Sequence, residues 1–518
     1  MKSSPHPIQH TLVFMGALCL IFTLILSRPR LPDVLESSIP SWAALRSDES
    51  QMSAEAAVSI LENYQLQPAA SDSMNAKMDT AHTAQPESVA PISIPATSGP
   101  PVLQLSEVSY DRKAIDQFLH SNLQLIGNPD AFAHLGGFFG LLDAQDRTPA
   151  IHIFHFGDSQ IEGDRITGVL REAWQETWGG GGPGLLSPAL PIPSLAMRQK
   201  WSKGWQRHAR YGKKDSLIEH NRYGMLAAYA HHHSDESTDS TASIRLTPHP
   251  KGYRRNSRFN ELHVLMGAVP EGARLHYRLN DSDEISLDLM ADSMCHHTVI
   301  ALPALDSIPF ESLDVSFSGS VPEINGIGMW SQSGIVVHNI AMRGSSGTVF
   351  RSLDRSQFKR QMDDFRTGMI ILQFGGNAVP YLEDQAAADR YGNWFASQIR
   401  LFQSIKPDTP IIVIGPSDMA RKVGTRMETY PQLTLVRDAL RRVAIEHDAL
   451  YWDVFEVMGG AGSMAAWVQS DPPLASTDHI HFTPKGAREM AELFRKSIHA
   501  EWALWQNYQA EQSLVHAP

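Results

Sequence analysis

The sequence predicts an α/β protein: a doubly wound, three-layer domain on a parallel five-stranded sheet, interrupted by an inserted all-β sandwich or jelly-roll domain. Two observations carry this prediction. Continuous apolar runs alternate with helical patterns in the α/β parts, which is typical of strands buried on both faces of a parallel sheet. Between those parts, short runs alternate apolar and polar residues and are separated by turn residues, which is typical of an antiparallel sandwich.

Length and composition narrow the class of protein. The 518 residues exceed one ordinary domain, so several folded units are expected. Hydrophobic residues make up 42% and charged residues 19%, which is a normal globular balance. The net charge of −12 leaves no basic field for nucleic acid, and no zinc-finger motif appears, so no nucleic-acid partner is predicted. Two cysteines, Cys19 and Cys295, do not fix the redox compartment.

The amino-terminal part predicts attachment to a membrane. Residues 1–30 are interpreted as a membrane anchor or a signal peptide, because Thr11–Ser27 form an almost unbroken apolar run. No small-x-small cleavage site follows this run, which favours an uncleaved anchor. Residues 31–108 are rich in Ser, Ala, Pro and Thr and predict a low-complexity linker.

Residues 109–195 predict the first part of the α/β domain. A strand over Ile151–Gly157 is followed by Asp158-Ser159 and by an amphipathic helix expected over Ile161–Trp178. The glycine-rich run Gly179–Gly184 is not a phosphate loop, since no Gly-Lys-Ser/Thr follows it. We expect this run to let the backbone turn tightly near the functional site.

The inserted β-sandwich is predicted over residues 196–333, and the α/β domain resumes over 334–510. The strands expected in this second part cover 335–340, 368–374, 410–415 and 449–453. The helices expected there cover 384–404, 433–447 and a last stretch from 484 to about 508.

Side chains able to do chemistry follow these strands. Ligands bind outside the carboxyl ends of the strands in such a sheet, and the residues found there are Ser159, Gly344, Asn377, and Asp478 with His481. A serine needs a base, a histidine can take its proton, and an aspartate can orient the imidazole. The backbone N–H groups of Ser159 and Gly344 and the amide of Asn377 can form an oxyanion hole. Alone, Ser159 can equally be read as a helix N-cap.

Four short motifs carry these residues: Gly-Asp-Ser with Ser159, the loop with Gly344, Gly-x-Asn with Asn377, and Asp-x-x-His with Asp478 and His481. In this order, each after a predicted strand, they resemble the four sequence blocks of the SGNH/GDSL hydrolase superfamily. Asn339, five positions before Gly344, also resembles the family's second block, whereas Gln160 replaces the leucine that usually follows Gly-Asp-Ser. The long separation of Ser159 from Gly344 far exceeds the roughly 30 residues of a βαβ step. An SGNH domain split there by a β-rich insert is similar to Ape-type peptidoglycan O-acetylesterases. The resemblance implies a flavodoxin-like fold with Ser159, Asp478 and His481 as a catalytic triad.

Several residues keep alternative interpretations. His479 could serve as the base in place of His481, and Asp478, His479 and His481 could ligate a metal. No further ligand cluster stands out, so neither a metal nor a cofactor is predicted. Arg343, next to Gly344, is a candidate for contact with an anionic substrate or a plain surface residue.

Three tryptophans of the insert are candidates for substrate contact. Trp201, Trp205 and Trp330 could stack on sugar rings, and they could equally pack the sandwich core or the seam between domains.

Together these observations predict a serine esterase that removes O-acetyl groups from a bacterial envelope polysaccharide, with peptidoglycan favoured. Its partners would be the acetylated polysaccharide and, through the amino-terminal segment, the membrane. We expect it in the cell envelope, anchored in the inner membrane and facing the periplasm, or secreted to it. A polysaccharide O-acetyltransferase, a lipase or thioesterase on the same fold, and a non-catalytic glycan-binding scaffold remain as alternatives.

Overall fold

The computed structural model describes residues 118, 120–144, 146–212, 218–233, 241–303 and 309–515. The anchor predicted for residues 1–30 and the linker predicted for 31–108 therefore lie outside the described residues. Among the helices that are described, none combines the length and apolar character needed to cross a membrane.

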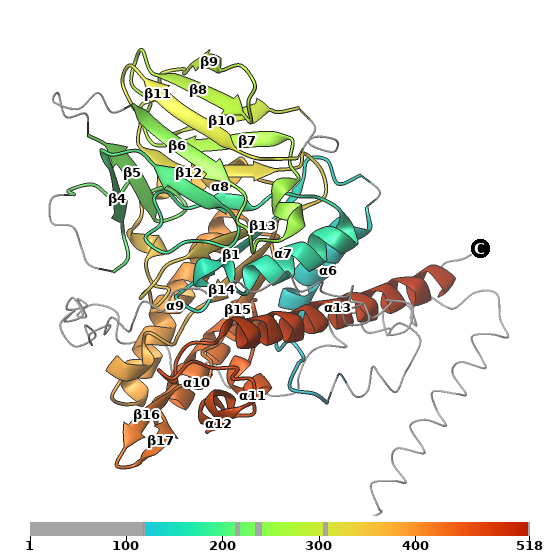
Figure 1. Cartoon of the computed structure of the whole chain (residues 1–518). Helices are drawn as coiled ribbons and strands as arrows, with labels where there is room; N and C mark the ends of the chain where they lie inside the picture. Colours follow the sequence, from blue (N-terminus) through green and yellow to red (C-terminus); the bar gives the residue numbers. More distant parts are fainter. Residues whose placement is uncertain are drawn as a thin grey trace, which may run out of the picture.

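A parallel five-stranded sheet forms the centre of the α/β part (Figure 1), as predicted. Its strands lie in the order β13-β1-β14-β15-β18, which is 2-1-3-4-5 in chain order and so flavodoxin-like. The strands are β1 (Ile151–Gly157), β13 (Ile335–Ala341), β14 (Thr367–Gln373), β15 (Ile411–Ile414) and β18 (Leu450–Trp452). Most of their residues are buried, which explains why each reads as an apolar run and does not alternate.

Helices cover both faces of this sheet. Ile151 and Ile153 of β1 belong to one apolar cluster with one set of helices, and Phe154 and Phe156 belong to another cluster on the opposite face. The first set is α6 (Pro129–Asp143), α7 (Thr167–Trp178) and α13 (Pro484–Val515); the second is α8 (Arg355–Asp363), α9 (Gln385–Ile405) and α10 (Leu433–Glu446). Two short helices, α11 (Val454–Met458) and α12 (Ser463–Gln469), and the hairpin β16 (Ala420–Val423) with β17 (Arg426–Thr429) complete this part.

Two antiparallel sheets form the insert and lie above the parallel sheet in Figure 1. One has the order β10-β7-β12-β5-β4, with β2 also paired to β12, and the other has the order β3-β6-β11-β8-β9. The strands are β2 (Gly184–Leu186), β3 (Arg198–Trp201), β4 (Trp205–Ala209), β5 (Ala228–His232), β6 (Ala242–Thr247), β7 (Glu261–Met266), β8 (Arg274–Leu279), β9 (Ile285–Asp288), β10 (His296–Ala301), β11 (Leu313–Ser318) and β12 (Ile324–Trp330).

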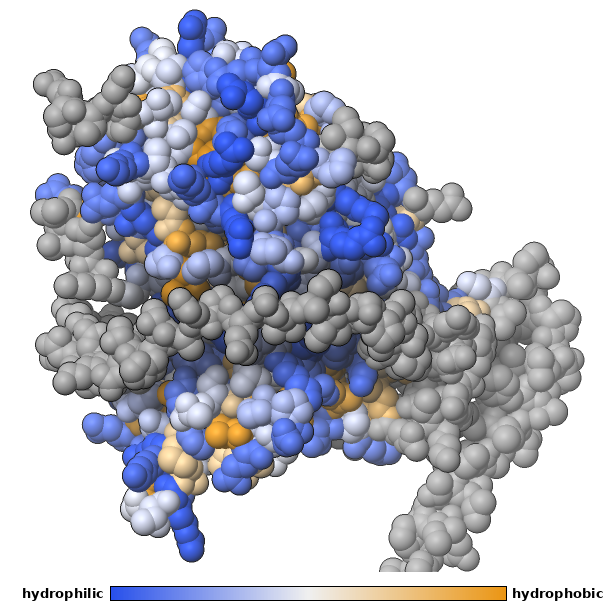
Figure 2. Space-filling view, in the orientation of Figure 1, coloured by the Kyte–Doolittle hydropathy of each residue, from blue (hydrophilic) through white to orange (hydrophobic). Residues whose placement is uncertain are grey.

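The insert has an apolar core of its own. Inward side chains of both sheets, including Ile244, Val264, Leu275 and Val315, form a single buried cluster. The outer surface of the insert that faces the viewer is mostly hydrophilic (Figure 2). This division of inner and outer faces is that of a sandwich, as the alternating pattern predicts.

The glycine run Gly179–Gly184, which follows α7, lies where the α/β part meets the insert. Its backbone runs beside the start of β13, where Ile335 N donates to Gly179 O at 3.0 Å. A Cβ on Gly180 would lie 2.4 Å from Ile335 O, and one on Gly182 would lie 2.2 Å from Met329 O. The expectation that this run turns near the functional site is therefore wrong, because it lies at the amino-terminal edge of the sheet, opposite Ser159.

Substitution of Gly180 tests this close approach. Gly179 and Gly180 both have positive φ angles, 80° and 100°, so alanine adds backbone strain at either position. Only at Gly180 does the added methyl group meet backbone atoms, whereas at Gly179 nothing lies within 4 Å. Gly180→Ala should therefore lower the melting temperature clearly more than Gly179→Ala in thermal unfolding followed by circular dichroism. Equal losses would contradict the contact.

Candidate active site

The register of the parallel strands brings the candidate residues to one edge of the sheet. Gly157, the last residue of β1, pairs with Ala341 of β13 and with Gln373 of β14. The loops that carry Ser159, Gly344 and Asn377 therefore start side by side. Function is expected at this edge in open α/β sheets.

The helix after Ser159 begins later than predicted. A 3-10 turn over Glu162–Asp164 interrupts the chain, and α7 begins only at Thr167. Gly163 and Asp164 have φ angles of 74° and 65°, and this left-handed backbone is incompatible with a continuous helix. The prediction of a helix from Ile161 is thus wrong, and Ser159 is not a helix N-cap.

A buried ion pair fixes this loop between β1 and α7. Asp164 accepts two hydrogen bonds from Arg171, at 2.7 and 2.9 Å, and both side chains are fully buried. Arg171 Nε also donates to Val337 O of β13 at 2.7 Å. The guanidinium therefore ties the loop and its own helix to the sheet.

A chain of buried polar side chains supports the same loop from the sheet side. Burial lowers the pKa of His155 to about 4, so its ring is neutral at pH 7. Since the Gln373 oxygen can only accept, the ring donates to it through Nε2 at 2.9 Å and accepts from the Thr167 hydroxyl through Nδ1 at 3.1 Å. Asn339 donates to Thr167 Oγ1 at 2.8 Å and to Ile161 O at 2.9 Å. Asn339, noted in the sequence for its spacing to Gly344, thus holds the loop that follows the serine.

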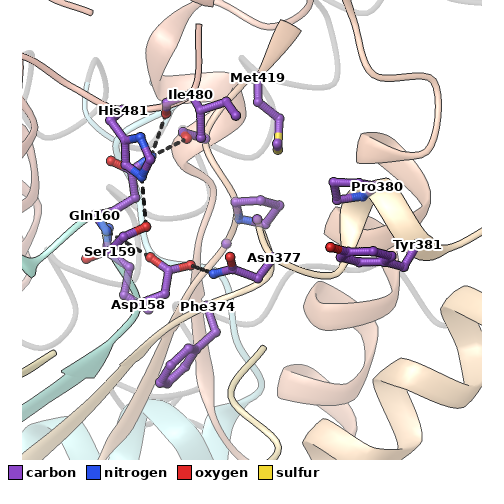
Figure 3. A pocket seen from close by; sticks show the side chains of 15 residues that line it. Asp158, Ser159, Gln160, Phe374, Asn377, Pro380, Tyr381, Met419, Ile480 and His481 are labelled. Carbon is purple, nitrogen blue, oxygen red and sulfur yellow. Dashed lines mark hydrogen bonds between the residues drawn. The ribbon is translucent and has the colours of Figure 1, made fainter. Parts of the chain in front are cut away.

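Ser159, His481 and Asp478 form a hydrogen-bonded series (Figure 3). Ser159 Oγ lies 2.8 Å from His481 Nε2, and His481 Nδ1 lies 2.7 Å from Asp478 Oδ2. Although partial burial by itself would raise the pKa of Asp478, hydrogen bonds from the His481 ring and from the backbone N–H groups of Ile480 and His481 lower it to about 2. The carboxylate therefore stays ionised at neutral pH, and His481, not His479, contacts the serine.

Two side chains brace the serine loop against the histidine loop. Gln160 Nε2 donates to Ile480 O at 2.7 Å, next to His481. Arg165 donates to Ser159 O at 2.8 Å and to Phe482 O at 3.0 Å. The distance between the serine and the histidine is thus set by side chains that bond backbone carbonyls of both loops. The sequence marked Gln160 as unusual but gave no sign of its partner, and it gave no signal for Arg165.

Asn377 reaches the pocket, but both amide hydrogens are already donated. Its Nδ2 bonds Asp158 Oδ2 at 3.0 Å and Ser345 O at 3.1 Å. Both amide hydrogens are therefore engaged within the protein, and the role of Asn377 in an oxyanion hole stays a prediction. The backbone N–H of Gly344, at a φ of 77°, has no hydrogen-bond partner within the described part of the chain.

Asp158 shapes the turn at the serine. Its Oδ1 accepts from the Gln160 N–H at 2.9 Å, and its Oδ2 accepts from Asn377. Burial raises the pKa of Asp158 to about 6, although these hydrogen bonds and the nearby His481 favour the charged form. Because a carboxylate can only accept, it also fixes which way the Asn377 amide points.

A pocket opens beside the serine. Its buried end includes Phe374, its lining includes the buried Met419, and its rim includes the exposed Tyr381 (Figure 3). The cavity volume is about 130 Å³, which is small beside the roughly 300–1,000 Å³ of typical ligand pockets. Ser159 and His481 both line it, so a small group held there would meet the serine hydroxyl.

The three tryptophans proposed for substrate contact lie elsewhere. Trp201 and Trp205 pack edge to face at 5.1 Å against the sandwich core. Trp330 is 2% exposed and stacks on His263 at 3.7 Å between the insert and the parallel sheet. None of them lines the pocket at Ser159, and packing explains all three.

Arg343 lies at the carboxyl edge of the parallel sheet and is exposed. Its Nη1 pairs with Glu162 Oε2 at 3.0 Å on the serine loop. Among the described residues, no group of three or more His, Cys, Asp or Glu side chains is arranged to hold a metal ion.

Comparison with known proteins agrees with this geometry. Residues 328–489 match the model of the GDSL-like lipase/acylhydrolase family. The matched part of the chain holds Gly344, Asn377, Asp478 and His481, and it is similar to a hydrolase domain of the SGNH/GDSL type. The protein is accordingly an enzyme of the ester-hydrolase class. No curated protein matches the chain in sequence.

Among solved structures, the SGNH hydrolase fold is shared with a peptidoglycan O-acetylesterase, at 22% identity and a TM-score of 0.55. The match covers 76% of this chain and 98% of that one, so it spans the insert as well as the α/β part. A salicylyl-acyltransferase from a tetracycline biosynthetic pathway matches at 14% identity and a TM-score of 0.26, over 60% of this chain and 96% of that one. A family two carbohydrate esterase from Clostridium thermocellum matches at 10% identity and a TM-score of 0.22, over 57% and 98%.

Replacement of Gln160 by leucine tests the brace between the two loops. Gln160→Leu removes the donor to Ile480 O and leaves that carbonyl without this partner, at a cost of about 1–3 kcal/mol. We expect kcat for an aryl acetate to fall about tenfold, with KM little changed. Gln332→Leu, at an exposed position of the insert junction, is the matched control. An unchanged kcat in Gln160→Leu would show that the brace is dispensable.

The raised pKa of Asp158 predicts a pH dependence of stability. An unfolded aspartate titrates near pH 4, so between about pH 4 and pH 6 the folded state binds a proton that the unfolded chain lacks. The free energy of unfolding should therefore fall as the pH rises through this window, by up to about 1.4 kcal/mol per pH unit from this one group. Asp158→Asn should remove that component, as measured by urea unfolding from pH 4.5 to 7.5.

Asp130→Asn, at an exposed position on α6, controls for the change in net charge. If Asp158→Asn and the unsubstituted protein show the same slope across the window, Asp158 does not titrate there.

Proposed function

We propose that this protein is a serine esterase that removes O-acetyl groups from a polysaccharide of the bacterial envelope, with peptidoglycan as its preferred substrate. The observation that carries the proposal is the hydrogen-bonded series from Ser159 through His481 to Asp478, placed at the mouth of a small pocket. This arrangement is suited to nucleophilic attack on an ester carbonyl.

In the proposed reaction, Ser159 Oγ attacks the acetyl carbonyl while His481 Nε2 takes its proton. Asp478 holds the ring through Nδ1 and stabilises the imidazolium that forms. His481 then gives the proton to the departing sugar oxygen, which leaves acetyl-Ser159. Water, deprotonated by His481, attacks this ester, and acetate departs as Ser159 recovers its proton.

The negative charge on the tetrahedral oxygen needs donors. We assign this role to the backbone N–H groups of Ser159 and Gly344, which have no partner among the described residues. Asn377 can join them if one amide hydrogen leaves Ser345 O, while its bond to Asp158 keeps the amide oriented. Asp158 therefore has a positioning role in the proposal.

Several features favour an acetyl ester over the alternatives. A cavity of about 130 Å³ suits a small acyl group better than the long chain of a lipase or thioesterase substrate. The His481 side chain is 28% exposed, which lets water reach an acyl-enzyme and favours hydrolysis over transfer. The complete series with short contacts argues against a non-catalytic scaffold.

The choice of a polysaccharide as the substrate rests on the similarity of this chain to a solved structure. The protein whose fold is shared across both the α/β part and the insert is a peptidoglycan O-acetylesterase. An anchor or signal peptide over residues 1–30 and a linker over 31–108 would fit an envelope enzyme that faces the periplasm or is secreted to it.

Acetate release provides the test. The full-length protein should release acetate from O-acetylated peptidoglycan faster than from acetylated xylan or acetylated alginate. Ser159→Ala should lower this rate at least about 10⁴-fold, because Ser159 is the pocket hydroxyl that contacts His481. His481→Asn should lose most activity, whereas His479→Asn, two positions away, should retain it because His479 does not contact the serine.

Each other outcome has a definite meaning. Preference for xylan or alginate would replace peptidoglycan with that glycan. Transfer of the acetyl group to an added glycan acceptor, without free acetate, would mark a transferase. Full activity in Ser159→Ala would refute the proposed mechanism.

A further inference from the structure

Tyr381 stands out on the rim of the catalytic pocket. Its side chain is 62% exposed, and it is the one aromatic among the large, exposed hydrophobic residues of the described chain. Neither its ring nor its hydroxyl has a partner within the described ranges. A single exposed apolar side chain is normal on a protein surface, so it is the position of Tyr381 at the pocket of Ser159 that calls for a functional explanation.

The backbone beneath Tyr381 is held firmly. The 3-10 turn Val379–Tyr381 begins two residues after Asn377, and Tyr381 N donates to Ala378 O at 3.0 Å. Val379 on the same turn is fully buried, and Pro380 restricts the backbone between them. The ring is therefore presented to solvent by an anchored turn.

The position of Tyr381 relates it to the departing part of the substrate. In Figure 3 it lies with Pro380 on one side of the pocket, while Ser159 and His481 lie on the other and Asn377 lies between. The buried end, with Phe374 at 1% exposure, is left for the acyl group. The alcohol that leaves must stay within reach of His481, whose side chain is 28% exposed, and the exposed Tyr381 lies across the pocket from it.

We propose that Tyr381 is the stacking platform for the sugar ring that carries the acetyl ester. A pyranose ring has apolar C–H faces surrounded by hydroxyl groups, and tyrosine offers an apolar ring face with a polar tip. This inference rests on the proposed deacetylation of a glycan and adds the residue that recognises the sugar. It places recognition at the catalytic pocket, at a distance from Trp201, Trp205 and Trp330.

If Tyr381 stacks on the sugar, its substitution should affect the hydrolysis of sugar esters much more than that of simple esters. With methyl 6-O-acetyl-glucopyranoside, Tyr381→Ala should raise KM about tenfold, and Tyr381→Phe should stay within about twofold of the unsubstituted enzyme, because the ring face is kept. With ethyl acetate, which has no ring, kcat/KM should change far less in Tyr381→Ala than it does with the sugar ester. Aryl acetates are avoided because their leaving group can itself stack on tyrosine. Met290→Ala, 76% exposed in the insert, is the control for loss of a surface side chain.

A second measurement does not depend on sugar deacetylation. Oligomers of N-acetylglucosamine should inhibit ethyl acetate hydrolysis competitively, and Tyr381→Ala should weaken this inhibition about tenfold.

The two proposals can fail separately. If the unsubstituted enzyme hydrolyses the sugar ester and Tyr381→Ala leaves both its KM and the inhibition constant unchanged, the stacking role is overturned and the esterase proposal stands. If Tyr381→Ala reduces turnover of both esters alike, Tyr381 supports the pocket generally, and the stacking role is again overturned. If the unsubstituted enzyme hydrolyses ethyl acetate only and is not inhibited by the oligomers, both the glycan function and the stacking role are refuted.

Discussion

A carboxylate and a guanidinium, both removed from water, hold the serine loop of this protein in place. Asp164 and Arg171 lose their hydration on folding, a large cost that a bidentate geometry and a third hydrogen bond to Val337 O offset. Removing either partner would leave an uncompensated buried charge, which typically costs about 3–5 kcal/mol. Since the pair joins the loop to α7 and to β13 at once, the position of Ser159 depends on it.

Other side chains at the edge of the sheet that carries Ser159 also hold its loops by hydrogen bonds. Arg165 and Gln160 bond backbone carbonyls of the histidine loop, and Asn339 bonds a backbone carbonyl of the serine loop. Backbone carbonyls are present whatever side chain occupies the position, so the spacing of serine and histidine is insensitive to changes at the bonded positions. The geometry is held by donors on one loop and main-chain acceptors on the next, a robust way to join segments distant in sequence.

The sequence was informative where a pattern has one physical cause. Strands such as Ile151–Gly157 and Thr367–Gln373 are buried on both faces, and this alone makes them continuous apolar runs. The carboxyl ends of such strands meet at one edge of the sheet, so topology, together with the family resemblance, was enough to single out Ser159, Asp478 and His481 as neighbours.

The sequence did not predict structural features that depend on contacts with residues far along the chain. The apolar spacing after Ser159 continues through Gly163 and Asp164, and only the contact with Arg171 and the left-handed backbone reveal the break in the helix. The orientation of Asn377 is set by Asp158 and by the Ser345 carbonyl. The exposure of Tyr381 and the burial of Trp330 are properties of the folded surface that no residue pattern encodes.

The position of the insert has a consequence for the order of events during synthesis. β1 is an interior strand of the parallel sheet, and its two neighbours, β13 and β14, both come after the insert in the chain. While the ribosome makes the two antiparallel sheets, β1 has no strand to pair with, although all of its residues end up buried. The insert, with its own apolar core, can fold during that interval, whereas the hydrolase sheet closes only afterwards. Formation of the active-site edge is thereby a late event, and it requires a long loop to close around a completed domain.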